Sequence, residues 1–247
     1  MDNIHIIIPA RFKSSRLPGK PLKKILGKEM IVRVADICAK VISKKKIIIA
    51  TDHLSIKAIC NKFGYKSLLT PKNCKTGTDR VFYVAKKIKS NFFVNVQGDE
   101  PLIDHLDIKK IIQMKKKFKD HVICGYCDIS YKNAISNNVP KVVINKHSDL
   151  VYMSRSLVPG TKKSNKIKNL KYLKQVCIYA FNYSELKKFH LFHGKSIIEN
   201  IEDIEILRFF DLRIPIKMVK VSNNSISVDV KEDLYKVKKV LKKNERY

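Results

Sequence analysis

The chain has 247 residues, of which 45% are hydrophobic and 30% charged, and this composition supports a packed core and excludes an intrinsically disordered protein. Its formal net charge is +29, from 51 Lys and Arg against 22 Asp and Glu. Most of these cations are lysines spread along the whole sequence, as on a solvated surface, whereas specific nucleic-acid recognition favours arginine. We expect no specific nucleic-acid partner, and a non-catalytic basic protein that binds RNA or membranes stays open as an alternative.

Other sequence features exclude further classes of protein. No stretch approaches the ~18 apolar residues that a membrane span requires, and no signal peptide is visible, so we expect a cytoplasmic protein without membrane insertion. The CxxC motif Cys124–Cys127 lies in an expected strand, which favours core packing over redox chemistry. His190 and His193 form an HxxH pair without a nearby third ligand, which favours a helix surface over a metal site.

Short β-branched runs alternate with segments of helical periodicity along the first half of the chain. The expected strands are 4–8, 46–50, 66–69, 92–96 and 122–129, and the expected helices are 30–43, 54–62, 77–89 and 108–119. This alternation predicts an α/β fold with a mostly parallel, Rossmann-like sheet and helices on both faces.

The alternation breaks down after residue 133. Shorter, antiparallel strands are expected at 142–144 and 150–153, then a polar loop at 156–171, a strand at 176–181, helices at 184–192 and 197–210, a strand at 216–221 and a helix at 231–243. We expect a single domain over 1–247, with 133–210 as an inserted antiparallel subregion.

A basic loop follows the first expected strand. Pro9–Leu22 reads PARFKSSRLPGKPL and carries Arg11, Arg16 and Lys20. Loops at the carboxyl ends of strands bind ligands in open α/β sheets, and cations with free backbone donors suit a polyphosphate. The loop is not a Walker A motif, because Lys20 is followed by proline where that motif has Ser or Thr.

Two aspartates at strand ends are candidates for a Mg²⁺ site. Asp99 follows the strand 92–96, and Asp229 lies between the last strand and the terminal helix. Mg²⁺ is commonly held by one or two carboxylates together with substrate phosphates, which the basic loop would place nearby. Either aspartate alone is also compatible with a helix cap.

Two further segments stand where strands or loops lead into helices. Thr76–Arg80 begins a helix that Thr78 or Asp79 is expected to cap, and its exposed amides suit a base or a phosphate. Ala50–Asp52 closes the second strand, and Asp52 is compatible with a cap of the next helix.

Together these segments resemble the 3-deoxy-manno-octulosonate cytidylyltransferase family. The strings that carry the resemblance are PARxxSxRLPGKPL at Pro9–Leu22, Ala50–Asp52, Thr76–Arg80, Asn95–Pro101, Val151–Arg155 and Ser227–Asp229. The resemblance implies a nucleotide-diphospho-sugar transferase fold, Mg²⁺, and transfer of CMP from CTP to the anomeric hydroxyl of 3-deoxy-D-manno-octulosonate (Kdo), with release of pyrophosphate, for lipopolysaccharide synthesis. It also implies a homodimer, with 133–210 binding the sugar and 133–172 supplying interface strands.

The resemblance assigns roles to particular residues. The implied catalytic residues are Arg11, Lys20, Asp99 and Asp229, with both aspartates on the metal. The implied CTP-binding residues are Ala10, Arg11, Ser14, Ser15, Arg16, Lys20, Thr76, Gly77, Thr78, Arg80 and Gln97. The implied sugar-binding residues are Gln97, Arg155, Gln175, Tyr179 and Glu205.

Three positions depart from the family pattern in the implied sugar pocket, and one of them is Cys177, where the family usually has glycine. Gln175 stands where the family usually has histidine, and Ile206 where it usually has glutamine. One unmade hydrogen bond to a buried hydroxyl costs about 1–3 kcal/mol, or about 5- to 150-fold in affinity. A cytidylyltransferase for another 2-keto sugar acid of the acylneuraminate type, and a member that binds CTP without turnover, stay open as alternatives.

Overall fold

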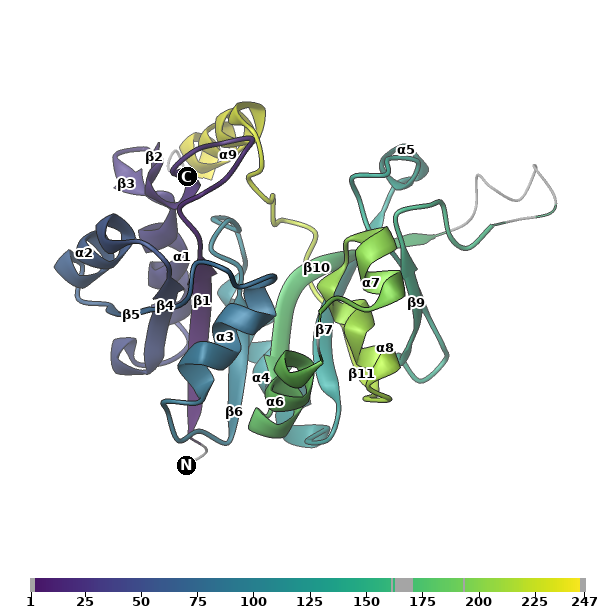
Figure 1. Ribbon diagram of the computed structural model, residues 1–247. Helices are drawn as coiled ribbons and strands as arrows, with labels where there is room; N and C mark the ends of the chain where they lie inside the picture. Colours follow the sequence, from purple (N-terminus) through teal and green to yellow (C-terminus); the bar gives the residue numbers. More distant parts are fainter. Residues whose placement is uncertain (1–2, 161, 163–170, 193, 245–247) are drawn as a thin grey trace. The chain divides into compact units, whose positions relative to one another are not determined.

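The computed structural model describes residues 3–160, 162, 171–192 and 194–244, and the chain divides into two compact units (Figure 1). The first unit comprises residues 1–109 and 224–247, and the second comprises 110–223. The segment 133–210, expected as an inserted subregion, falls within the second unit.

A parallel sheet forms the centre of the first unit. The strands are β1 (Ile4–Ala10), β4 (Ile47–Thr51), β5 (Lys66–Leu69) and β6 (Phe92–Val96), and they pair in the order β6-β1-β4-β5. Each of β4 and β6 is buried along its whole length, as expected for apolar runs in a sheet covered on both faces. The connecting helices are α1 (Met30–Ala39), α2 (Leu54–Lys62) and α3 (Gly77–Ala85), and α9 (Lys231–Asn244) joins this unit from the end of the chain.

A small hairpin that sequence reasoning missed follows the basic loop. A 3₁₀ turn (Lys20–Leu22) leads into β2 (Lys24–Ile25), which pairs antiparallel with β3 (Lys28–Glu29). The two residues between the strands, Leu26 and Gly27, both have positive φ, 46° and 79°. Two-residue turns with positive φ at both positions usually have the sequence Asn-Gly or Asp-Gly, and the Leu-Gly sequence here does not indicate such a turn.

Mixed pairing distinguishes the second unit. β7 (Val122–Ile129) pairs in parallel with β11 (Ile216–Lys220) and antiparallel with β10 (Tyr172–Phe181). β8 (Lys141–Ile144) and β9 (Leu150–Ser154) form the antiparallel pair that was expected, and β8 also pairs with β10. α4 (His105–Lys117) connects the two units along the chain, and a short helix, α5 (Tyr131–Ala134), follows β7.

The prediction of one helix over 197–210 is wrong. The structure has α7 (Ile197–Glu202), a 3₁₀ turn (Glu205–Leu207) and α8 (Arg208–Asp211), preceded by α6 (Tyr183–Leu191). Asp203 adopts a left-handed conformation with φ 49° and ends α7. Apolar residues recur at helical spacing on both sides of this break, so the sequence pattern conceals it. In the structure only the second piece buries apolar side chains, among them Ile206, Leu207 and Phe209, whereas Ile197 and Ile201 on α7 are exposed.

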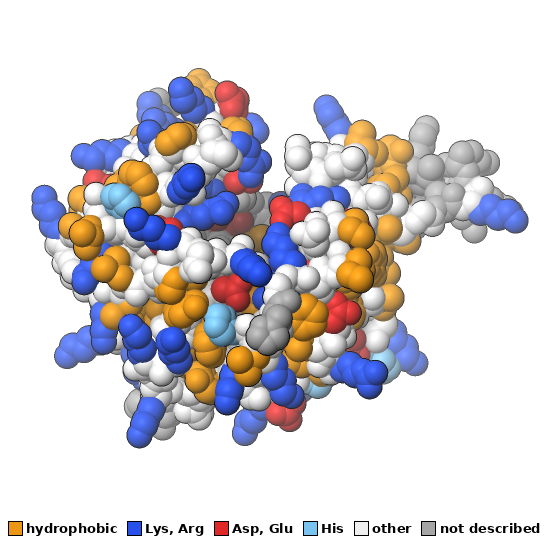
Figure 2. All heavy atoms as spheres, viewed as in Figure 1, with side chains coloured by type: hydrophobic (Ala, Val, Ile, Leu, Met, Phe, Trp, Pro, Cys, Tyr) orange, Lys and Arg blue, Asp and Glu red, His pale blue; other side chains and the backbone are white. Residues whose placement is uncertain are grey.

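Several smaller expectations were also tested. Cys124 and Cys127 are buried in β7, which confirms the core-packing interpretation, and burial raises the pKa of Cys124 well above its ordinary value. The expected polar loop 156–171 lies largely outside the described residues, as does His193. Among the described residues, no helix is long and apolar enough to cross a bilayer. Lys and Arg are spread over the visible face of each unit, with apolar and acidic side chains between them (Figure 2).

Candidate active site in the first unit

The basic loop is closed upon itself at the end of β1. Gly19 N donates to Phe12 O over 3.3 Å, and Gly19 has a φ of 64° that favours glycine at this position. Phe12 N donates to Asp52 Oδ1 over 2.9 Å, and the Phe12 ring stacks on His53 with 3.8 Å between ring centroids. Leu17, which is 2% exposed, packs against Met30, Val228 and other core residues. These contacts fix the loop and leave Arg11, Ser15 and Arg16 exposed.

Lys20 lies between the two candidate carboxylates. Its Nζ atom donates to Asp99 Oδ2 over 2.6 Å and to Asp229 Oδ1 over 3.2 Å. Arg16 adds a third cationic contact, with Nη2 at 3.3 Å from Asp229 Oδ1. Burial alone lowers the pKa of Lys20, but the ion pairs with Asp99 and Asp229 raise it more, so the net shift is upward. Residues separated by 209 positions therefore meet around one ammonium group.

The backbone holds the two aspartate segments together. Val228 N donates to Asp99 O over 2.9 Å, so the residue before Asp229 is tied to Asp99 itself. The side chain of Asp233 accepts from Asp229 N over 3.1 Å and so caps the start of α9, which leaves the Asp229 carboxylate directed to Lys20 and Arg16. A Cβ at Gly98 would lie 2.9 Å from Pro9 O, so glycine is required here for close packing against β1.

The expected capped helix start in Thr76–Arg80 is present, but its capping residue differs from the prediction. Thr76 is the N-cap: its hydroxyl accepts from Asp79 N over 3.0 Å, and Asp79 Oδ2 accepts from Thr76 N over 3.1 Å. The expected caps, Thr78 or Asp79, are therefore wrong, although Asp79 is the reciprocal partner of this capping box. Gln97 reaches this turn, since its Nε2 atom would lie 3.1 Å from a Cβ at Gly77.

Arg80 and Asp52 form a buried pair below the loop. Arg80 Nη2 lies 3.2 Å from Asp52 Oδ2, and Arg80 also donates to Thr70 Oγ1 and Pro71 O. Both side chains are at most 10% exposed. His53, not Asp52, caps α2, with Nδ1 accepting from Ser55 N over 3.2 Å. Asp52 thus joins Arg80 to the backbone of the basic loop, a role that the sequence did not indicate.

Of the implied sugar-binding residues, Gln97 lies in the first unit and the other four lie in the second. Gln175 Nε2 donates to Tyr179 OH over 3.1 Å on β10, and both side chains are buried. Burial raises the pKa of Tyr179 well above its ordinary value, and the neighbouring Cys177 and Glu205 act in the same direction. Gln175 and Tyr179 therefore form a buried polar pair on β10, while Ile206, which follows Glu205, is fully buried in the core.

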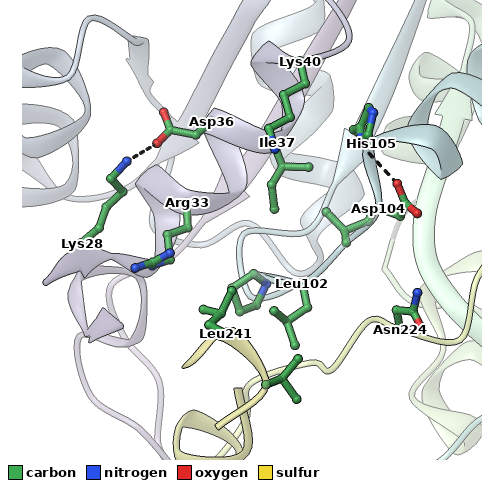
Figure 3. A pocket seen from close by; sticks show the side chains of 13 residues that line it. Lys28, Arg33, Asp36, Ile37, Lys40, Leu102, Asp104, His105, Asn224 and Leu241 are labelled. Atoms are coloured by element: carbon green, nitrogen blue, oxygen red, sulfur yellow. Dashed lines mark hydrogen bonds and ion pairs between the residues drawn. The ribbon is translucent and has the colours of Figure 1, made fainter. Parts of the chain in front are cut away.

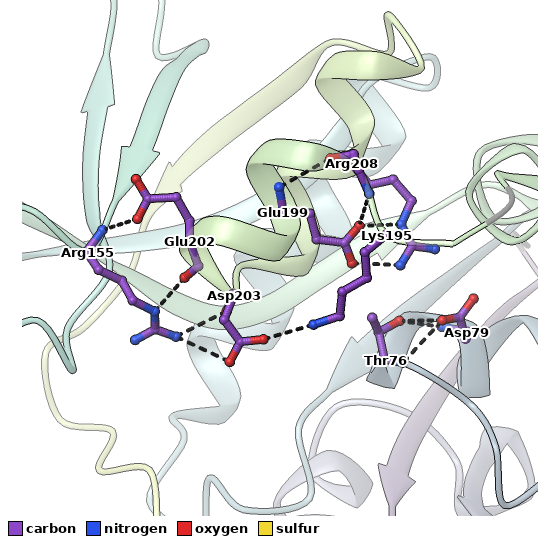
Figure 4. Close-up of polar contacts among 9 residues, drawn as sticks. Thr76, Asp79, Arg155, Lys195, Glu199, Glu202, Asp203 and Arg208 are labelled. Atoms are coloured by element: carbon purple, nitrogen blue, oxygen red, sulfur yellow. Dashed lines mark hydrogen bonds and ion pairs between the residues drawn. The ribbon is translucent and has the colours of Figure 1, made fainter.

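Arg155, the remaining implied sugar ligand, is held by the end of α7 (Figure 4). Its Nε atom donates to Glu202 O over 2.5 Å, and Nη2 donates to Asp203 O over 3.1 Å. The Glu202 carboxylate accepts from Arg155 N over 2.7 Å, which fixes the end of β9 against α7. Nearby, Glu199 forms a fully buried bidentate pair with Arg208, at 2.6 and 2.7 Å.

The donor set around Lys20 fits a magnesium ion that also binds phosphate. Two carboxylates, Asp99 and Asp229, converge on one positive centre. The described residues contain no cluster of three or more His, Cys, Asp or Glu side chains suited to a metal. A pair of carboxylates matches Mg²⁺, which retains waters and takes its further ligands from substrate phosphates.

The sequence is similar to known proteins over nearly its whole length. Residues 5–216 match the family model described as "Cytidylyltransferase". The chain is 34% identical to the 3-deoxy-manno-octulosonate cytidylyltransferase of Escherichia coli, over 98% of this chain and 97% of that protein. It is 37% identical to the enzyme of the same name from Francisella philomiragia, over 97% and 99%.

Solved structures are similar as well. A CMP:2-keto-3-deoxy-manno-octonic acid synthetase complexed with CTP aligns with a TM-score of 0.91 and 33% identity, over 98% of this chain and 99% of that chain. A 4-diphosphocytidyl-2C-methyl-D-erythritol synthase from Anaerococcus prevotii shares the fold at a TM-score of 0.63 and 17% identity. These findings confirm the predicted α/β nucleotidyltransferase fold and the predicted enzyme class. The chain belongs to the 3-deoxy-manno-octulosonate cytidylyltransferase family.

Proposed function

We propose that this protein transfers CMP from CTP to the anomeric hydroxyl of Kdo and releases pyrophosphate. The observation that carries the proposal is the meeting of Lys20 with Asp99 and Asp229 at the end of the basic loop. The site thus combines cations for a triphosphate with two carboxylates for a divalent cation. Nearly full-length identity to named enzymes of this activity supports the same reaction.

The reaction is an in-line displacement at the α-phosphorus of CTP. A bond forms between the anomeric oxygen of Kdo and the α-phosphorus, the bond from that phosphorus to the bridging oxygen of pyrophosphate breaks, and the hydroxyl proton is released. Catalysis of this kind depends mainly on positioning and charge stabilisation. Arg11, Arg16 and Lys20 stabilise the triphosphate and the departing pyrophosphate, while Ser14, Ser15 and the Thr76–Thr78 turn supply polar contacts to the nucleotide.

Mg²⁺ belongs to the proposal, with Asp99 and Asp229 as its protein ligands. When bound, it would neutralise charge at the α-phosphate and make the attacking hydroxyl more acidic. The sugar acid is proposed to contact Gln97, Arg155, Gln175, Tyr179 and Glu205. A cytoplasmic location and a place in lipopolysaccharide synthesis belong to the same proposal, since CTP is a cytoplasmic substrate and Kdo a lipopolysaccharide sugar.

The direct test is pyrophosphate release from CTP, Mg²⁺ and Kdo, with each component omitted in turn. We expect release only with all three, and a loss of at least about 100-fold in Asp99→Asn, because removal of one electrostatic catalytic group commonly costs this much. Glu232→Gln is the matched control, an exposed carboxylate near the start of α9 that should leave the rate unchanged. Faster release with N-acetylneuraminate than with Kdo would contradict the proposed acceptor, and full activity of Asp99→Asn would contradict the proposed site.

A homodimer is the remaining part of the proposal. Ile197 and Ile201 on α7 are 78% and 74% exposed, and Val151 on β9 is 53% exposed. Ile197 and Ile201 are four residues apart on α7 and so share one face of the helix, and a contiguous exposed apolar face is typical of a subunit interface. In analytical ultracentrifugation we expect a dimer that Ile201→Asp converts to a monomer, whereas Tyr235→Asp, at a 73% exposed position on α9, leaves it intact. A monomeric wild-type protein would contradict the dimer without bearing on catalysis.

A further inference from the structure

A cavity of about 820 Å³ lies in the first unit, apart from the proposed active site (Figure 3). Its walls come from α1, the loop between Asp99 and α4, and α9. None of Lys20, Asp99 or Asp229 lines it. Its volume falls in the range of about 300–1,000 Å³ that is typical of small-molecule sites.

The α1 wall carries the charge. Arg33, Asp36, Ile37 and Lys40 follow one another at helical spacing along the same face of α1 (Figure 3). The Asp36 carboxylate is neutralised by Lys28 Nζ at 2.6 Å and also accepts from Tyr65 OH. This wall therefore contributes more positive than negative charge to the cavity.

Two of its cations have no carboxylate partner among the residues that the structure describes. Arg33 donates to the carbonyl oxygens of Ile25 and Leu26, at 2.7 and 3.1 Å, which fixes its guanidinium but leaves its charge uncompensated. Lys40 is exposed at the end of α1 and makes no ion pair within residues 3–160, 162, 171–192 and 194–244. The one other acidic lining residue, Asp104, lies 3.3 Å from its neighbour His105.

The other walls are mainly apolar, although Asp104, His105 and Asn224 also line them. Leu102 and Ile103 come from the loop, and Val240 and Leu241 come from α9. Leu102 and Leu241 also pack against the core cluster that includes Met30, so this part of the cavity is continuous with the folded core. Cations on one wall and an apolar surface on the others match an amphipathic ligand with a negative head.

We propose that this cavity binds an organic anion with an apolar body, such as a carboxylate or phosphate ester that carries an aliphatic or aromatic group. The head lies near Arg33 and Lys40, and the body lies against Leu102, Val240 and Leu241. The proposal does not depend on the proposed reaction, because no residue of the cavity belongs to the proposed catalytic or binding residues.

The test uses the fluorescent anion anilinonaphthalene sulfonate as the probe and the folded wild-type protein. We expect a single saturable site, from which octanoate and octyl phosphate displace the probe, whereas octanol competes poorly because it lacks the charge. Preference for octyl phosphate over octanoate would identify a phosphate head, and the reverse a carboxylate. The absence of saturable binding, or equal competition by octanol, would overturn the proposal.

Substitutions on two different walls locate the site. Lys40→Glu should weaken probe binding by about fivefold, as expected for one partly exposed charge, and Val240→Asp should weaken it through the apolar wall. Both positions are exposed, so neither variant should unfold, which circular dichroism verifies. Lys62→Glu, an equal charge change on α2, is the matched control. If Lys62→Glu weakened probe binding as much as Lys40→Glu, probe binding would depend only on the net charge of the protein, and the proposed site would be refuted.

Discussion

Replacing Lys20 by methionine separates two effects of its ammonium group: the group competes with a metal ion for Asp99 and Asp229, and it stabilises the triphosphate during the proposed reaction. In the ligand-free protein Lys20 neutralises Asp99 and Asp229, whereas in the proposed reaction it stabilises the triphosphate. Methionine has nearly the same length and no charge. We therefore expect the variant to bind a divalent cation more tightly without nucleotide, yet to turn over more slowly.

The magnitude follows from the two ion pairs. The Asp99 contact, at 2.6 Å between side chains that are 15% and 26% exposed, is a charge-assisted hydrogen bond worth about 1.5–3 kcal/mol. The Asp229 contact is longer, at 3.2 Å, and Asp229 is 42% exposed, so screening reduces it to about 0–1 kcal/mol. In the wild-type protein a metal ion must break both Lys20 contacts to reach the carboxylates, which costs roughly 2–3 kcal/mol of binding free energy. The variant has no such cost, so it should bind Mn²⁺ about 30- to 150-fold more tightly.

Electron paramagnetic resonance of free Mn²⁺ measures this affinity directly, and pyrophosphate release measures turnover, which should fall by about 10- to 150-fold. Lys13→Met is the matched control, because Lys13 is an exposed lysine of the same loop. If Mn²⁺ affinity and turnover both fell in Lys20→Met, Lys20 would be a structural support of the carboxylates rather than their displaceable counter-ion, and the reasoning would be refuted.

Three further outcomes are expected. Gly98→Ala should lower the free energy of unfolding by about 1–3 kcal/mol, because its Cβ would lie 2.9 Å from a backbone carbonyl oxygen, whereas Gly160→Ala, with no atom within 4 Å, should be neutral in urea denaturation. Gln175→His should lower the KM for Kdo by about 5- to 150-fold and leave the KM for CTP unchanged; equal changes in both would contradict a role in sugar binding. Glu202→Gln should destabilise the protein at neutral pH. Burial raises the pKa of Glu202, but hydrogen bonds from Arg155 N and the Ser154 hydroxyl lower it more, so the net shift is downward. The ionised Glu202 carboxylate therefore stabilises the fold above its ordinary pKa, and this contribution is lost as the pH falls through the lowered pKa. The stability difference from wild type should therefore shrink in acid, and a constant difference would exclude this ionisation as its cause.

The fold of the first unit was predictable because its signals are local. Runs such as Ile47–Thr51 and Phe92–Val96 have four apolar residues out of five, and such a run indicates a strand buried on both faces. The break at Asp203 was not predictable, since the apolar period continues through it. The turn at Leu26 was hidden for a related reason, because leucine seldom adopts a positive φ.

The candidate site shows where sequence reasoning reaches its limit. Lys20, Asp99 and Asp229 were each identified from a motif at a strand end, and parallel strands bring such ends to the same edge of a sheet. Arg80, at the start of α3, was assigned to the nucleotide only through the family resemblance, and in the structure it is buried against Asp52, 28 residues earlier in the chain. A motif specifies which side chains a loop carries, whereas the partner of each charge depends on residues that only the folded chain brings near. Asp52 also accepts a hydrogen bond from the backbone of the basic loop, so a substitution of Arg80 alters the support of that loop as well as any contact with CTP. Loss of activity in an Arg80 variant therefore does not by itself demonstrate the proposed contact with CTP.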